Sequence, residues 1–284
     1  PPARARALAT SPHGGGKLSA SILLVGAGRM GGALLKGWLA RGLGPLVVVE
    51  PNASPELRKL ARRGVTLVKQ IEDAPADIRA CVIALKPQVL KREAPRLTPV
   101  AQSGALMISI AAGTTTALMR KAWGREARIV RAMPNIPGAI GEGISALYAA
   151  PGASAKDRKL AESLSAALGE TVWVKRESDV DTVTAVSGSG PAYVFLLTEA
   201  LAEAARREGL PSDIAQRLAR QTVIGSGALL KSDPSSPERL RTNVTSPGGT
   251  TEAALEILLG TDGLKPLIAR TVRAARKRAR TLAG

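Results

Sequence analysis

The chain has 284 residues, of which 45% are hydrophobic but only 2% aromatic, so its core must be built from Ala, Leu, Val and Ile. One cysteine and one histidine exclude an internal disulfide and a metal site made of those residue types, and the lone Cys81 suits a reducing cytoplasm. The net charge of +17 favours acidic substrates and a phosphate-bearing cofactor. The basic runs lack the interleaved aromatic residues that a nucleic-acid partner would use, so a solvated helix face explains them.

Residues 1–20 are basic and contain several Gly and Pro residues, without the apolar segment of a secretory signal, so we expect a disordered leader. No apolar run is long enough for a membrane span, and no membrane partner is expected. The remaining chain is long enough for two domains. We expect a dinucleotide-binding domain over residues 21–176 and an all-helical domain over residues 177–284.

A glycine-rich turn opens the first domain. An apolar strand over 22–25 is followed at once by Gly26-Ala27-Gly28-Arg29-Met30-Gly31 and then by a helical pattern that reaches Leu39. This is the G-x-G-x-x-G motif between a strand and a helix, where the glycines allow a tight turn and a close approach of the backbone to a pyrophosphate. A glycine turn with a structural role alone is the alternative.

An acidic residue follows at the distance at which it can meet the ribose hydroxyls. A second strand over 46–49 precedes Glu50, which lies 50 − 31 = 19 residues after Gly31. Asn52, Ser54 and Arg58 are close by and could hold a 2′-phosphate if Glu50 turned outward. The pattern predicts NAD(P)H as cofactor, with NADH favoured over NADPH because Glu50 would repel the extra phosphate.

Strands and helices continue to alternate, which predicts a Rossmann-type doubly wound parallel sheet. Further strands are expected at 65–68, 81–85, 105–110, 128–131, 144–149 and 171–174, and helices at 58–63 and 155–168. Ligands of such sheets lie at the carboxyl ends of the strands, so Lys86-Pro87 and Ala111-Ala112-Gly113 are candidate cofactor edges. Turns of this kind are also rich in Gly and Pro for geometric reasons alone. The prolines of the segment 132–137 fix an irregular stretch that suits a wall beside a reactive ring.

The second domain shows helical periodicity without strands. The segment Ser187-Gly188-Ser189-Gly190-Pro191 interrupts the pattern, and long helices are expected from Ala192 to Ala204 and from Ile214 to Leu230. The second of these is apolar on most faces, and a domain of this size offers few places where such a helix is buried on every side. We therefore expect a homodimer that forms through the helical domain.

A polar, hydroxyl-rich stretch from Thr242 to Glu252 lies between two helical patterns. Gly248 and Gly249 leave backbone N–H groups uncovered, and Thr250 or Thr251 is expected to cap the following helix. Amides, hydroxyls and a positive helix end in one place predict a site for a small carboxylate. An ordinary capped turn between two helices is the alternative.

From Ile22 to about Leu282 the chain resembles the pyrroline-5-carboxylate reductase family. The segments that carry the resemblance are Ala84 to Pro87, Ala111 to Gly113, Arg131 to Pro137, Ser187 to Tyr193 and Asn243 to Thr251. The resemblance implies NAD(P)H-dependent reduction of 1-pyrroline-5-carboxylate to L-proline, the final step of proline biosynthesis. It also implies an intertwined homodimer, and five such dimers could assemble into a decamer.

The patterns and the resemblance together assign the site. Thr251 is the candidate catalytic residue, and no metal ligand is expected. The candidates for substrate binding are Ser187, Ser246, Pro247, Gly248, Gly249, Thr250 and Thr251. The candidates for cofactor binding are Gly26, Ala27, Gly28, Arg29, Met30, Gly31, Glu50, Asn52, Ala84, Leu85, Lys86, Pro87, Ala111, Ala112, Gly113, Met133, Pro134, Asn135 and Asn243.

Part of the chemistry follows from the residues alone. A nicotinamide delivers hydride to an electrophilic carbon, and since the only histidine is His13 in the leader, a substrate that brings its own activated electrophile, such as a cyclic iminium, fits best. A hydroxyacid dehydrogenase is one alternative, but those enzymes use a helix-borne lysine, and none follows the Ser187–Pro191 turn before Lys231. A non-catalytic dinucleotide-sensing regulator is another, although it would have no evident use for the Ser246–Thr251 loop.

Overall fold

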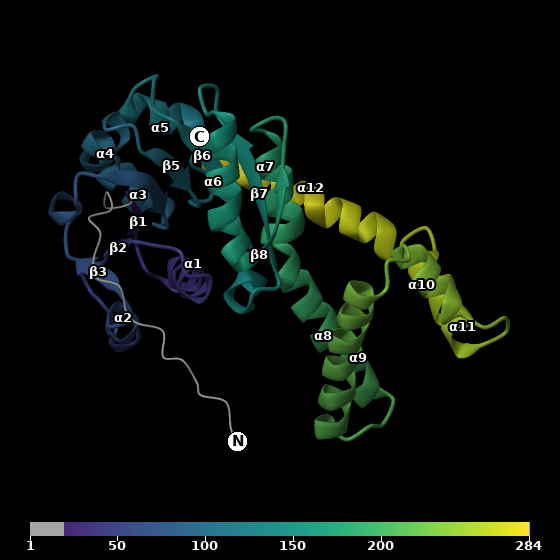
Figure 1. Cartoon of the computed structure of the whole chain (residues 1–284). Helices are drawn as coiled ribbons and strands as arrows, with labels where there is room; N and C mark the ends of the chain where they lie inside the picture. The colour runs from purple at the N-terminus through teal and green to yellow at the C-terminus, as the bar shows by residue number, and fades with distance from the viewer. Residues whose placement is uncertain (1–19, 284) are drawn as a thin grey trace, which may run out of the picture.

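The computed structural model describes residues 20–283, in which eight strands form one sheet in the order β3-β2-β1-β4-β5-β6-β7-β8 (Figure 1). Neighbouring strands are parallel except for β6 and β7, which are antiparallel. The predicted leader lies outside the described residues apart from Ala20. The strands are β1 (Ser21–Val25), β2 (Leu46–Val49), β3 (Val65–Val68), β4 (Ile78–Ile83), β5 (Leu106–Ser109), β6 (Ile129–Met133), β7 (Gly143–Ala149) and β8 (Gly169–Trp173).

Helices cover both faces of this sheet, because alternate residues of each strand point to opposite sides. Ile22 and Leu24 of β1 pack in one apolar cluster and Leu23 and Val25 in the other. The helices on the first face are α1 (Arg29–Ala40), α2 (Pro55–Ala61) and α6 (Ala155–Ser165). Those on the second face are α3 (Pro87–Glu93), α4 (Thr98–Gln102) and α5 (Thr116–Trp123). The predicted Rossmann-type, doubly wound sheet is therefore confirmed, with one antiparallel pair added.

The boundaries of two elements differ from the expected ones for local reasons. α2 begins three residues earlier than predicted, at Pro55, because the hydroxyl of Ser54 accepts a hydrogen bond from Leu57 N at 3.1 Å and caps the helix. β4 begins at Ile78 instead of 81 and places Cys81 at the centre of the sheet, fully buried. Burial raises the pKa of the Cys81 thiol, so this residue is a small core side chain and not a reactive group.

The chain after β8 is helical. α8 and α9 form a hairpin that extends away from the sheet, α10 and α11 lie beyond it, and α12 runs back toward the sheet (Figure 1). None of the described helices is long and apolar enough to cross a membrane. The elements are α7 (Asp179–Val183), the π-helical turn η5 (Thr184–Gly188), α8 (Gly190–Arg207), α9 (Ser212–Ser232), α10 (Pro237–Asn243), α11 (Thr250–Leu259) and α12 (Leu264–Ala283).

The segment 187–191 does not interrupt the helical pattern as predicted. The helix continues from α7 through η5 into α8, with Ser189 N donating to Thr184 O at 2.8 Å in a widened turn. Gly188 lies against Met133, because a Cβ at residue 188 would lie 2.9 Å from Cε of that flexible side chain. This contact sets the start of the helical part directly against the end of β6.

Candidate active site

The predicted cofactor residues follow the ends of neighbouring parallel strands. β1, β2, β4, β5 and β6 end at Val25, Val49, Ile83, Ser109 and Met133. Because these strands run in the same direction, their carboxyl ends lie at one edge of the sheet, where ligands of such sheets bind. The segments that the structure brings to this cofactor edge are 26–31, Glu50 with Asn52, 84–87, 111–113 and 133–135.

Close backbone contacts shape the glycine turn. Gly26 has φ +90°, and a Cβ on it would lie 2.9 Å from Ala84 O. A Cβ on Gly31 would lie 2.2 Å from Gly26 O, so α1 can pack against the turn only with glycine there. A Cβ on Gly28 would meet nothing within 4 Å. Space is thus open at the second glycine, the N-cap of α1, where a pyrophosphate would meet the first amides of the helix.

Glu50 turns inward, toward the glycine turn. Its Oε2 accepts a hydrogen bond from Ala27 N at 3.0 Å, and its Oε1 accepts one from Asn52 N at 3.2 Å. The residues considered for a 2′-phosphate have local partners, since Ser54 caps α2 and Arg58 Nε donates to Ala53 O at 3.2 Å. A cavity of about 300 Å³ lies between α1 and α2, with Ala27, Gly28 and Arg29 of the glycine turn in its wall.

A second hollow, of about 510 Å³, lies where the cofactor edge meets the start of α8. It is lined by Asn135 and Pro137 from the segment after β6 and by Ser187, Pro191 and Phe195 from the helical part, among others. The Oδ1 of Asn135 accepts a hydrogen bond from Ile144 N at 2.9 Å, which fixes this wall. The structure therefore brings Ser187 close to the predicted cofactor residues Met133 to Asn135.

The Ser246–Thr251 loop lies elsewhere. It joins α10 to α11, at the end of α12 that is remote from the sheet, and Asn243 is the last residue of α10 (Figure 1). One chain thus does not bring Asn243, Ser246, Pro247, Gly248, Gly249, Thr250 or Thr251 to its own cofactor edge. This loop and the edge can form one site only across two copies of the chain.

The expected cap by Thr250 or Thr251 is wrong. The N-cap of α11 is Gly249, in extended conformation and without a side-chain hydrogen bond, and the two threonines are the first residues of the helix. Gly248 N donates instead to Oε2 of Glu252 at 2.7 Å. Since neither threonine caps the helix, their hydroxyls stay available to a ligand, which weakens the alternative of an ordinary capped turn.

Comparisons with known proteins match the two parts of the chain to two family models. Residues 177–282 match the family model described as pyrroline-5-carboxylate reductase dimerisation, and residues 21–113 match the one described as NADP oxidoreductase coenzyme F420-dependent. A pyrroline-5-carboxylate reductase of Pseudomonas aeruginosa is 36% identical, over 92% of this chain and 96% of its own length. The chain belongs to the pyrroline-5-carboxylate reductase family. One from Glycine max is 33% identical over 93% and 96% of the two chains.

Solved structures of the family share the fold. A pyrroline-5-carboxylate reductase from Coxiella burnetii superposes with a TM-score of 0.87 at 35% identity, covering 94% of this chain and all of the other. A pyrroline carboxylate reductase from Plasmodium falciparum, solved with NADP bound, gives 0.78 at 27% identity over 95% of this chain and all of the other. Both superpositions include the sheet and the helical part of the chain.

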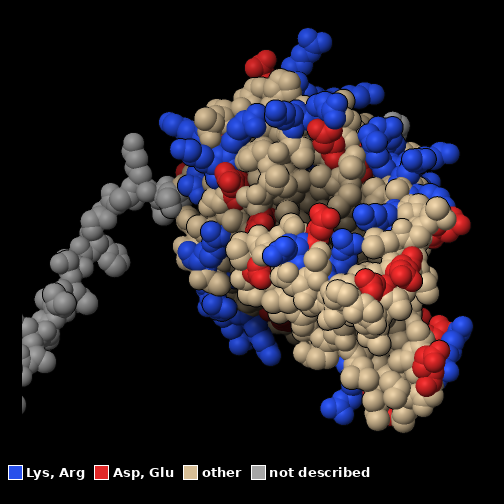
Figure 2. All heavy atoms as spheres, turned by 90° about the vertical axis from the view of Figure 1, so that its right-hand side faces the viewer, with Lys and Arg blue, Asp and Glu red and all other residues tan. Residues whose placement is uncertain are grey.

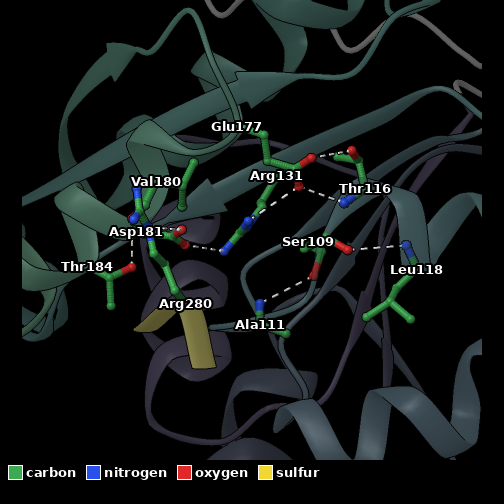
Figure 3. Close-up of polar contacts among 11 residues, drawn as sticks. Ser109, Ala111, Thr116, Leu118, Arg131, Glu177, Val180, Asp181, Thr184 and Arg280 are labelled. Carbon is green, nitrogen blue, oxygen red and sulfur yellow. Dashed lines mark hydrogen bonds and ion pairs between the residues drawn. The ribbon is translucent and has the colours of Figure 1, made fainter. Parts of the chain in front are cut away.

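A cluster of charged residues beside the cofactor edge is not predicted from the sequence. Arg131 of β6 is buried, with 2% of its surface exposed, and it lies between Glu177 and Asp181 (Figure 3). Its partners are 46 and 50 residues further along the chain, too far for a pattern in sequence. The available signal was an arginine within an otherwise apolar strand, where a charge needs a buried partner. Within residues 20–283, no group of three or more His, Cys, Asp and Glu could hold a metal ion.

We predict that Gly31→Ala lowers the melting temperature and weakens the binding of a reduced nicotinamide, because the new Cβ would overlap Gly26 O in the turn. The neighbouring Gly32→Ala is the matched control, since its Cβ would lie 3.5 Å from Ala27 O, an ordinary contact. Differential scanning calorimetry compares the two variants. Equal melting temperatures for both would contradict the packing role assigned to Gly31.

Proposed function

We propose that this protein reduces 1-pyrroline-5-carboxylate to L-proline with hydride from a nicotinamide cofactor. One observation carries the proposal: the same chain holds an open dinucleotide turn and a separate loop in which the hydroxyls of Thr250 and Thr251 do not cap the helix. The amides of Gly248 and Gly249, expected to be uncovered, instead donate to Glu252 Oε2 and Ser246 O, so the hydroxyls are the groups left for a ligand. The first suits a pyrophosphate and the second suits a small carboxylate. Membership of the pyrroline-5-carboxylate reductase family supports the identity of the substrate.

The reaction needs little from the protein beyond position. A reduced nicotinamide bound at the cofactor edge would supply a hydride to the carbon of the protonated C=N group, whose π electrons would move to nitrogen, giving proline and the oxidised cofactor. The iminium is its own electrophile, so holding the substrate carboxylate on the 246–251 loop, with the ring against the nicotinamide, supplies the main catalytic effect. The described residues 20–283 contain no histidine, which agrees with a reaction in which the protein positions an already activated substrate.

The test is an assay of the purified protein with each reduced cofactor. We predict that absorbance of the reduced nicotinamide falls on addition of 1-pyrroline-5-carboxylate and stays constant on addition of 2-keto acids. Turnover of a hydroxyacid or keto acid instead would favour the dehydrogenase alternative. Cofactor binding without any turnover would favour a sensing regulator.

We further propose that two copies complete each site. α8 has no buried residue, and Phe195 and Leu196 on it are each 63% exposed. Figure 2, which views the helical end of the molecule, shows a broad uncharged area among the Lys and Arg side chains. Exposed apolar surface of this kind marks an interface. In such a dimer the 246–251 loop of one copy would face the cofactor edge of the other; a decamer of five dimers rests on the family resemblance alone.

We predict a mass of two chains or a multiple of two by light scattering at micromolar concentration. Leu196→Glu should dissociate the dimer and abolish turnover, because it places a charge in the exposed apolar face of α8. Val172→Glu is the control, because Val172 is also exposed, at 44%, but lies on the edge strand β8. A monomeric wild-type protein with full activity would contradict the shared site.

For Thr251 we propose a hydrogen bond to the substrate, at the carboxylate or near the ring nitrogen. Thr251→Ala should raise KM for the imine by about tenfold or more, since a hydrogen bond to a charged group contributes roughly 1.5–3 kcal/mol. The melting temperature should not change, because Gly249 and not Thr251 is the helix cap. Thr242→Ala is the control, since that hydroxyl already donates to Glu238 O at 3.0 Å. A lower melting temperature with normal kinetics would instead mean that Thr251 only supports the helix.

For the cofactor we propose a preference for NADH over NADPH. The carboxylate of Glu50 lies against Ala27 N in the glycine turn, where it would accept hydrogen bonds from the ribose hydroxyls and repel a 2′-phosphate. Glu50→Ser should therefore raise the ratio of kcat/KM for NADPH to that for NADH by about fivefold or more, from a repulsion of order 1 kcal/mol or more. KM for the imine should stay constant. Glu50→Gln removes the charge at nearly constant size, and a ratio unchanged by both variants would show that Glu50 does not select the cofactor.

The two proposed domains meet in the short segment between β8 and α7. We place the dinucleotide-binding domain at residues 21–176 and the helical dimerisation and substrate-binding domain at residues 177–284.

A cytoplasmic location is supported by the free, buried thiol of Cys81.

A further inference from the structure

The charged cluster beside the cofactor edge joins three parts of the chain. Arg131 of β6 places Nη1 3.3 Å from Oε1 of Glu177 and Nη2 3.9 Å from Oδ1 of Asp181 (Figure 3). Arg280 of α12 places Nε 3.9 Å from the other oxygen of Asp181. Two arginines and two carboxylates thus balance in charge, and the side chains of Arg131 and Asp181 are only 3% and 13% exposed.

Glu177 also holds the start of α5. Its Oε1 accepts a hydrogen bond from Thr116 N at 2.7 Å, and its Oε2 accepts one from the Thr116 hydroxyl at 2.7 Å. Thr116 is the first residue of α5, so the carboxylate also lies at the positive end of that helix. One side chain, located where the sheet passes into the helical part, therefore fixes the C-terminal end of the loop 110–115.

The same loop is held at two further points. Near its beginning, Ala111 N donates to the hydroxyl of Ser109 at 3.3 Å. In its middle, Gly113 has φ +71°, and a Cβ there would lie 3.0 Å from Leu282 O at the end of α12. The loop with Ala111 to Gly113 follows β5 at the cofactor edge, so these contacts set how far its backbone reaches toward a bound nicotinamide.

We propose that Glu177 is a positioning residue for hydride transfer. Glu177 does not lie among the residues assigned to the cofactor. It acts through Thr116, which follows the Ala111–Gly113 loop, and through Arg131, which lies on β6 two residues before Met133. Without Glu177 the buried guanidinium would keep only the more distant Asp181, and the first amide of α5 would lose its acceptor. The inference rests on the proposed reduction of a cyclic imine, because the geometry of hydride transfer is what the loop would adjust.

The experiment uses the full chain and compares Glu177→Ala and Glu177→Gln with the unmodified protein. Glu177→Ala should lower kcat by about tenfold to a hundredfold, as a misplacement of about 1 Å does. It should also raise the isotope effect with deuterated reduced nicotinamide, because hydride transfer becomes the slow step. Glu177→Gln should recover part of the rate, since its amide oxygen can still accept from Thr116 N and its NH2 can donate to the Thr116 hydroxyl, whereas the charge of Arg131 loses its nearer counter-ion. Glu170→Ala, at an exposed acid on β8, should behave as the unmodified protein.

Thr116 supplies a second pair of variants in case Glu177→Ala does not fold. Thr116→Val removes the hydroxyl that donates to Glu177 at nearly constant size, whereas Thr116→Ser keeps it. The valine variant should shift kcat and the isotope effect in the direction of Glu177→Ala, and the serine variant should not. A merely structural role would lower the melting temperature and the amount of active protein while leaving the isotope effect and KM unchanged, and that result would overturn the proposal.

A binding measurement separates this proposal from the proposed reaction. The dissociation constant of the reduced cofactor, followed by its fluorescence, requires no turnover of the imine. We expect it to rise about tenfold in Glu177→Ala and Thr116→Val and to stay constant in Thr116→Ser. If the unmodified protein binds the cofactor without reducing the imine, the proposed function fails, and equal dissociation constants in all variants would overturn the positioning role on its own.

Discussion

The helical half of the chain has more apolar surface than one copy can cover, and the proposed location of the substrate site depends on this excess. Neither α8 nor α11 has a buried residue, although both carry several large aliphatic side chains. A single sheet with helices on both faces is complete by itself, whereas a helical hairpin that extends from it is not. Because the 246–251 loop belongs to the incomplete part, a second copy has to place it relative to a cofactor. In the proposed function, dimer formation and catalysis therefore depend on the same surface.

The path of the chain explains how this extended part is still oriented. It leaves the sheet through α7, η5 and α8, and α12 returns to pack against η5 and α7. Both ends of this excursion touch the cofactor edge at a glycine: Gly188 lies against Met133, and Gly113 lies against Leu282. A side chain at Gly113 would be strained at its positive φ and would press on Leu282 O, whereas one at Gly188 would meet only the flexible end of Met133. The orientation of the helical part is thus set close to the cofactor, although its tip lies far from the sheet.

The sequence predicts the features that depend on neighbouring residues and not those that depend on distant ones. The glycine turn, the alternation of strands and helices and the position of Glu50 follow from spacing along a short stretch of chain. The capping of α11 is mispredicted because Thr and Gly are both good N-caps, and the choice between Gly249 and the threonines depends on the turn before them. The π-helical turn at η5 is missed because glycine and proline usually end a helix, whereas here the glycine makes room for Met133. The link from Glu177 to Thr116 spans 61 residues, and no local pattern reports it.

The charge balance of the buried cluster suits the proposed chemistry. An iminium substrate is cationic, and the nicotinamide becomes cationic as it loses hydride, so an uncompensated arginine near the ring would oppose both. Arg131 lies two residues before Met133, the last residue of β6, and it is buried where its charge is poorly screened. Glu177 and Asp181 neutralise it, and Arg280 in turn balances the second carboxylate. The cluster can therefore hold the loop and the strand end rigidly without adding net positive charge at the place where positive charge develops.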